Sequence, residues 1–130
     1  MSQENVEIMR ASYERAARGD FNYMDLLADD AEFVTSPELP DAGVYRGEAA
    51  RRWIETWIDS FEGLTMEATE IIDADDKVVV GIFQQGRLRG SETTVDGRWW
   101  QVATFRDGKV IRSELFPERS AALEAAGLSE

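Results

Sequence analysis

The chain has 130 residues, of which 43% are hydrophobic and 31% charged, and this length suffices for one domain around one core. A formal net charge of -12 repels phosphate backbones and anionic headgroups, so nucleic acid and membrane surfaces are excluded as expected partners. Because the sequence has no cysteine and no histidine, it excludes disulfides, thiolate nucleophiles and the commonest metal ligands. We expect neither a metal nor a cofactor.

Residues 1–5 contain no basic stretch and lead into no apolar segment of the signal-peptide kind. No apolar run approaches the length that spans a membrane. We therefore expect a cytoplasmic protein.

Two helices are predicted at the start of the chain. The first covers residues 3–18, with Ser2 as its N-cap and Gly19 ending it. Its apolar residues recur at helical spacing: Val6, Met9, Tyr13, Ala16 and Ala17. Asp20 then caps a short second helix, whose shared face carries Phe21, Met24 and Leu27.

A short strand, a loop and a third helix follow. The strand is Ala31–Thr35, and the loop covers residues 36–43, which are rich in turn formers. The helix is predicted to begin at Gly47 and end at Gly63. Its single buried stripe consists of Ala50, Trp53, Ile54, Trp57, Ile58 and Phe61.

From Leu64 the apolar period falls to two, which indicates strands. After a turn at Asp73–Asp76, the segment Lys77–Arg89 is apolar on both faces at first, so it is expected to be central in a sheet. A turn near Arg89 leads into a strand that ends at Arg106. Within it, Asp96-Gly97 indicates either a bulge, which we favour, or a hairpin.

Asp107-Gly108 predicts a tight hairpin between the last two strands. Pro117 begins a terminal helix that Gly127 ends. Runs of helices followed by runs of strands indicate an α+β fold in a single domain, residues 1–130. We expect a cone-shaped, curved mixed β-sheet with three helices of the N-terminal half on its concave face and a short C-terminal helix. The cone encloses the natural ligand site.

Several local motifs extend over nearly the whole chain in one characteristic order. They are Tyr13 ahead of Gly19-Asp20, then Leu27–Ala31, Pro37–Gly43 with Tyr45–Gly47, Arg106–Val110 and Ala122–Gly127. On these motifs the sequence resembles the SnoaL-like branch of the nuclear transport factor 2-like superfamily. That superfamily includes ketosteroid isomerases, polyketide cyclases, epoxide hydrolases and dehydratases, so the resemblance implies the fold and leaves the reaction open.

The resemblance to ketosteroid isomerases can be tested residue by residue. The catalytic base falls at Thr35, whose hydroxyl is no base near neutral pH. The neutral acid of the oxyanion hole falls at Gln101. The tyrosine donor falls within one residue of Tyr13. Tyr13 and Gln101 are therefore the candidates for catalytic hydrogen bonding.

The cyclase and hydrolase resemblances lose their principal residues as well. The acid/base aspartate of the last strand falls at Leu115, or at Glu114 if the count from the hairpin shifts by one. Strand alternation favours Leu115, because Ser113 and Leu115 share the face of Gln101. The Arg-x-Asp pair of the hydrolases falls in Ile82–Gln85, which has no charge.

What remains is a large, aromatic and nearly uncharged pocket for a small apolar molecule. Its polar points are Tyr13, Thr35, Gln85 and Gln101. The ligand-binding candidates in full are Tyr13, Phe33, Thr35, Trp53, Trp57, Phe83, Gln85, Trp99, Gln101, Ala103, Ser113 and Leu115. Three functions stay open: a binding domain, an isomerase, cyclase or hydrolase acting on an apolar substrate, and a scaffold with a filled cone.

Two surface features complete the predictions. Glu38 and Asp41 lie in a loop that could bring a carboxylate to the pocket, while Arg87 and Arg89 are either solvated or face an anionic ligand. The outward face of the last strands carries apolar residues that suggest a partner surface, and the resemblance implies a homodimer through that face. These residues are Trp100, Val102, Thr104 and Phe116.

Overall fold

Six strands form one curved sheet in the computed structural model, which describes residues 2–35 and 42–128. In chain order they are β1 (Leu27–Val34), β2 (Val44–Arg46), β3 (Phe61–Ala74), β4 (Lys77–Leu88), β5 (Thr94–Arg106) and β6 (Lys109–Phe116). The spatial order is β2-β1-β6-β5-β4-β3, and β1 pairs parallel to β6 while the other neighbours are antiparallel. This mixed sheet confirms the predicted α+β fold class.

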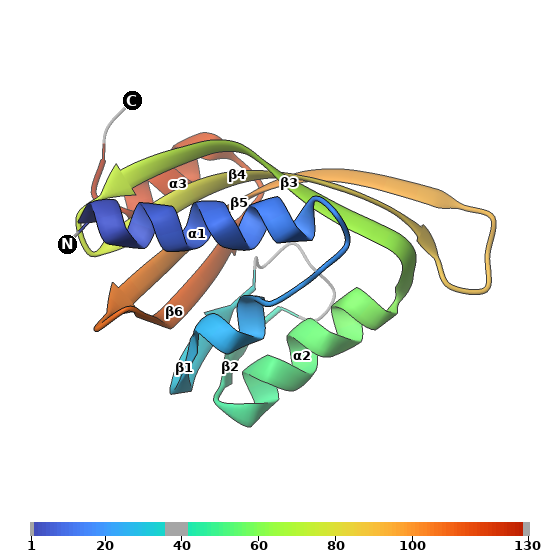
Figure 1. Ribbon diagram of the computed structural model, residues 1–130, viewed down its shortest axis with the longest axis horizontal. Coiled ribbons are helices and arrows are strands. Elements are labelled where there is room, and N and C mark those ends of the chain that lie inside the picture. Colours follow the sequence, from blue (N-terminus) through green and yellow to red (C-terminus); the bar gives the residue numbers. More distant parts are fainter. Residues whose placement is uncertain (1, 36–41, 129–130) are drawn as a thin grey trace.

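The helices divide between the two faces of the sheet. The concave side carries α1 (Ser2–Ala16), the 3₁₀ helix η1 (Tyr23–Leu26) and α2 (Glu48–Asp59), and the short C-terminal helix α3 (Arg119–Ala125) lies behind the sheet (Figure 1). Within the described ranges, no helix combines the length and the apolarity that crossing a membrane requires.

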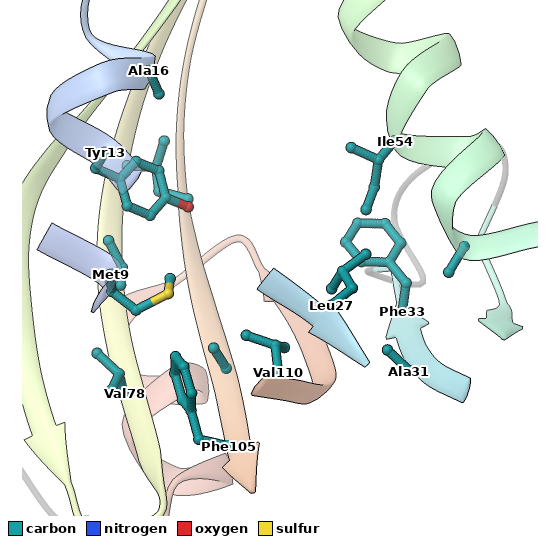
Figure 2. Packing of buried hydrophobic residues seen from close by; sticks show 14 of the residues in the cluster. Met9, Tyr13, Ala16, Leu27, Ala31, Phe33, Ile54, Val78, Phe105 and Val110 are labelled. Atoms are coloured by element: carbon teal, nitrogen blue, oxygen red, sulfur yellow. The ribbon is translucent and has the colours of Figure 1, made fainter. Parts of the chain in front are cut away.

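Alternation along β4 and β5 builds both layers of the core. Val78 and Val80 face the concave side and pack in one cluster with Met9 and Tyr13 of α1. Figure 2 shows these two α1 side chains on one side of that cluster, with Leu27, Phe33 and Ile54 on the other. Val79, between the two inward valines, packs with α3 instead.

The strand connections follow the sequence signals closely. Asp107 and Gly108 have φ of 52° and 78°, the left-handed pair that a two-residue hairpin of this type requires. The predicted hairpin is therefore confirmed. The predicted terminal helix is confirmed as well, by α3. The predicted N-terminal helix and the helix after Gly47 are confirmed too, with boundaries that differ by a few residues.

Four local predictions are wrong, each because tertiary pairing overrides a local signal. Asp20 does not cap the second helix: it pairs with Arg15 at 2.9 Å, and Asn22 occupies the position before η1. The first strand begins at Leu27, which was assigned to that helix.

Gly63 does not end α2 but lies inside β3, where the register shifts between Glu62 and Thr65. Its φ of 65° fits a bulge that needs a glycine. Conversely, Asp96 and Gly97 pair in continuous register with Gln85 and Gln84, so the bulge expected there is absent.

The convex face is covered in part by the chain itself. Val102 is completely buried and Thr104 is 8% exposed, because Ala122 and Leu123 of α3 pack on this face. Trp100 and Phe116 are half-buried against the same helix. All four residues thus lie on the outward face as predicted, but α3 buries Val102 and Thr104, so these two are not part of an exposed surface.

Arg119 fastens α3 to the sheet. Its guanidinium donates to both carboxylate oxygens of Glu70, at 3.1 and 3.0 Å, and lies 5.8 Å from the ring centre of Trp100. Trp100 in turn crosses Gly81, its direct partner on β4. A Cβ at Gly81 would lie 2.8 Å from the Trp100 ring and 2.7 Å from Thr69 Oγ1.

We therefore expect Gly81→Ala to lower the free energy of unfolding by about 1–3 kcal/mol, because the indole must move off the sheet. Urea denaturation measures this change. Gly97→Ala is the matched control, since a Cβ there meets nothing closer than 3.9 Å. Its effect should stay within about 0.5 kcal/mol. Equal effects of the two substitutions would contradict the packing of Trp100 on Gly81.

Candidate functional site

A cavity of about 90 Å³ lies between the concave face of the sheet and the helices α1, η1 and α2. Roughly 10–15 Å³ of such space accommodates one water, so the cavity is several times larger than a packing defect. Its wall contains no charged side chain among the described residues. The cavity therefore suits an uncharged molecule.

The wall is dominated by an aromatic cluster. Trp53 and Trp57, one turn apart on α2, stack with ring centres 5.8 Å apart and planes 9° apart. Trp99 of β5 meets Trp57 edge-on at 5.6 Å, and Phe33 of β1 lies 4.9 Å from Trp53. The i, i+4 spacing of the two α2 tryptophans places both rings on the same side of the helix.

The polar part of the wall is a hydrogen-bond network around Gln101. Tyr13 donates its hydroxyl proton to Gln101 Oε1 at 2.6 Å. Gln101 Nε2 donates to the Tyr23 hydroxyl at 2.7 Å and to Ser113 Oγ at 2.9 Å. Four elements, α1, η1, β5 and β6, thus meet at one carboxamide that is 3% exposed.

Burial keeps both tyrosines of this network protonated. Desolvation raises the pKa of Tyr13 well above its ordinary value of 10.0, and the neighbouring Tyr23 raises it further. Desolvation also raises the pKa of Tyr23, while hydrogen bonds from Ser113 and Gln101 act in the opposite direction. At neutral pH both groups are neutral phenols, which can donate or accept a hydrogen bond but cannot serve as bases.

A second polar group lies on β4. Gln84 is 1% exposed, and its Oε1 accepts a hydrogen bond from Trp57 Nε1 at 3.1 Å. Near η1, Ser12 donates to Asn22 Oδ1 at 3.0 Å, and both of these residues also line the cavity.

Seven of the predicted site residues line the cavity together. They are Tyr13, Phe33, Trp53, Trp57, Trp99, Gln101 and Leu115. Ser113 lies behind Gln101 as its hydrogen-bond partner, and Ala103, completely buried, belongs to the concave core. The apolar stripe of α2 accounts for the position of Trp53 and Trp57, and alternation on β5 and β6 accounts for that of Trp99, Gln101 and Leu115.

The other three lie elsewhere. Phe83 and Gln85 occupy the outer face of β4, where Phe83 lies 4.7 Å below the Arg98 guanidinium and Gln85 is exposed. Thr35 is buried, and its Oγ1 accepts a hydrogen bond from the Gly43 amide at 2.9 Å. Thr35 thereby ties together the two ends of the loop and does not line the cavity.

Sequence reasoning missed Gln84 and Tyr23. Because β4 is apolar on both faces from Val78 to Phe83, its alternation did not indicate which face is inward. The register with β5 would have identified Gln84, since Val80 lies opposite Gln101. Tyr23 gave no comparable signal, because η1 is placed by contacts with distant segments.

The charged residues near the cavity bind backbone carbonyls and other charged side chains and so stabilise the surrounding fold. Arg51 of α2 donates to the carbonyl oxygens of Met24 and Leu27 at 2.9 and 3.1 Å, which fixes η1 against β1. Arg87 pairs with Glu62 at 3.1 Å. Arg89 donates to the carbonyl oxygens of Asp59, at the end of α2, and Phe61, at the start of β3. Neither arginine lines the cavity.

Acidic side chains are the other groups that could bind a metal ion or transfer a proton. In the part of the chain that the structure describes, no group of three or more acidic side chains is placed to hold a metal ion. Glu38 and Asp41, the predicted loop carboxylates, lie outside the described residues.

The chain belongs to the SnoaL-like domain family, which matches residues 9–113. This range contains the aromatic cluster and the complete Gln101 network. No curated protein matches the sequence.

Solved structures share the fold over nearly the whole chain. The nuclear transport factor 2-like (NTF2-like) protein of Burkholderia xenovorans LB400 is 26% identical, with 97% of each chain covered and a TM-score of 0.66. A SnoaL-like protein of Jannaschia sp. CCS1, a candidate polyketide cyclase, is 18% identical, with 99% of this chain and 95% of that chain covered and a TM-score of 0.75. TerC, co-crystallised with polyporic acid, is 23% identical, with 95% and 98% covered and a TM-score of 0.69.

The raised tyrosine pKa values predict the stability of the protein at alkaline pH. Unfolded tyrosines ionise near pH 10 while Tyr13 keeps its proton in the fold, so stability should fall by about 1.4 kcal/mol per pH unit for each such group above pH 10.

Tyr13→Phe should be about 1–3 kcal/mol less stable than wild type at pH 8, since Gln101 Oε1 loses its donor. The difference should narrow between pH 10 and 11. Urea denaturation at each pH measures both effects, and parallel pH profiles would contradict a buried neutral Tyr13.

Proposed function

We propose that this protein binds a small, uncharged, apolar molecule in the cavity between the sheet and the helices. The observation that carries the proposal is an aromatic cavity whose described wall has no charged group. Aromatic walls with a few placed polar groups are typical of small-molecule sites. The cavity of about 90 Å³ favours a ligand of about one ring.

The chemistry of the site favours binding over conversion. The positions at which the resemblance expects carboxylates carry Thr35, Gln101 and Leu115. Thr35 is engaged with Gly43, and Gln101 with two tyrosines. A proton-transfer reaction needs a group that can take a proton near neutral pH, and none of the described lining residues is one.

One observation supports a catalytic alternative. Tyr13, Gln101 and Tyr23 form a connected set of hydrogen-bonding groups inside an apolar cavity, and such donors stabilise a developing oxyanion. TerC and the Jannaschia protein, one crystallised with polyporic acid and the other a candidate polyketide cyclase, make an oxygenated aromatic substrate reasonable. In this alternative the reaction would be an isomerisation or cyclisation, and the base would come from outside the described wall.

Tryptophan emission tests the binding proposal, because three of the four tryptophans line the cavity. We expect saturable quenching or enhancement when wild type is titrated with single-ring aromatics, and weaker responses to larger polyketide aromatics and steroids. Ala16→Phe should abolish the response, since Ala16 lines the cavity and is 5% exposed.

Ala17→Phe is the matched control, because Ala17 is exposed and points away from the cavity. It should bind as wild type does. Equal binding by the two variants would place the ligand outside the cavity. Absence of saturable binding by any compound to folded wild type would favour the scaffold function.

A further inference from the structure

The carboxamide of Gln84 has a determined orientation. An indole N–H is a donor and never an acceptor, so Trp57 Nε1 at 3.1 Å can pair only with the oxygen of Gln84. Gln84 Nε2, which carries two donor hydrogens, must therefore point away from Trp57. No such argument applies to Gln101, whose hydroxyl partners can each donate or accept.

The Gln84 amide nitrogen has no hydrogen-bond partner among the described residues, although the side chain is 1% exposed. The fully enclosed side-chain atom that lacks a partner there is Thr104 Oγ1, on the opposite face of the sheet. Gln84 Nε2 is therefore not sealed in the core but opens onto the cavity that Gln84 lines.

The neighbouring strand leaves room for a ligand at this nitrogen. Gly97 is the register partner of Gln84 on β5, so no side chain from that position covers the amide. The Trp99 indole nitrogen lies 3.9 Å from the point that a Cβ on Gly97 would occupy. It is a second donor with no acceptor among the described residues. Two neighbouring strands thus each contribute an N–H donor without an acceptor to the wall of the same cavity.

This donor pair is separate from the Gln101 network. Gln84 is four residues along β4 from Val80, which pairs with Gln101, so the backbone positions of the two glutamines are about 13 Å apart along the sheet. Ile82 and the body of Trp99 fill the interval between them. The cavity therefore has two polar regions. At Gln101 every polar side-chain atom is hydrogen-bonded, whereas at Gln84 and Trp99 the N–H donors have no acceptor among the described residues.

We propose that Gln84, oriented by Trp57, is the specificity-determining residue of this cavity and donates a hydrogen bond to an oxygen of the ligand. The inference rests on the proposed binding function. The ligand class is a neutral, ring-containing molecule with one carbonyl or ether oxygen. A carboxylate is disfavoured, because the described wall offers no cation and the chain carries a net charge of -12.

The test compares acetophenone with α-methylstyrene, which have the same shape but differ in carrying C=O or C=CH₂. Titration calorimetry gives the ratio of their dissociation constants for wild type and for two variants. In Gln84→Met the preference for acetophenone, relative to wild type, should fall about tenfold, because one buried hydrogen bond is lost. In the matched control Gln85→Met, on the outer face, the ratio should stay unchanged.

A second readout is independent of any substitution. The side-chain amide protons of Gln84 should shift downfield in ¹H–¹⁵N spectra on addition of acetophenone, as a donated hydrogen bond requires, and should show no such downfield shift with α-methylstyrene, which can change them only through its ring current. Should Gln84→Met fail to fold, Gln84→Leu serves instead, since it also removes the NH₂ group and leaves no hydrogen-bond donor at this position.

The outcomes separate the inference from the proposed function. If both compounds bind and the ratio is the same in wild type and the Gln84 variants, the inference is overturned while the binding function stands. If neither compound binds wild type, the inference is also overturned, and the binding function stands only if other ring compounds bind saturably. A ratio that changes in Gln84→Met alone, together with the Gln84 resonance shift, supports the inference.

Discussion

The hydrogen bonds of the Gln101 carboxamide are the interaction on which the rest of the site depends. They join a residue of β5 to Tyr13, Tyr23 and Ser113, which come from three other elements. A buried carboxamide without partners would destabilise the fold, so all four groups are needed at once. These hydrogen bonds hold α1 and η1 against the concave face of the sheet at β5 and β6.

The two faces of β4 and β5 have different roles. The inner face supports the cavity with Val80, Ile82 and Gln84, and the outer face packs against α3 around Val79 and Val102. A sheet buried on both sides is held rigidly. The aromatic cluster of Trp53, Trp57 and Trp99 therefore packs against a rigid sheet. Such rigidity lowers the entropy cost of binding a small molecule.

Membership of the SnoaL-like family accounts for the architecture and leaves the chemistry to individual residues. In this chain the described cavity wall carries aromatic rings and two glutamine amides and no charged side chain. The buried carboxamides of Gln101 and Gln84 differ in their hydrogen bonds. Both the oxygen and the nitrogen of Gln101 have partners, whereas only the oxygen of Gln84 has one among the described residues. The difference between them is the physical basis for the proposed ligand class.

The sequence alone determined the elements whose signals are local. The stripe on α2 predicted which side of that helix is apolar, Asp107-Gly108 predicted the hairpin, and the missing histidines and cysteines restricted the chemistry. Tertiary structure alone decided which face of β4 points inward. That strand is apolar on both faces, because α1 covers one and α3 covers the other, and a two-sided apolar pattern contains no information about direction. For the same reason Gln84, and not Gln85, reaches the cavity.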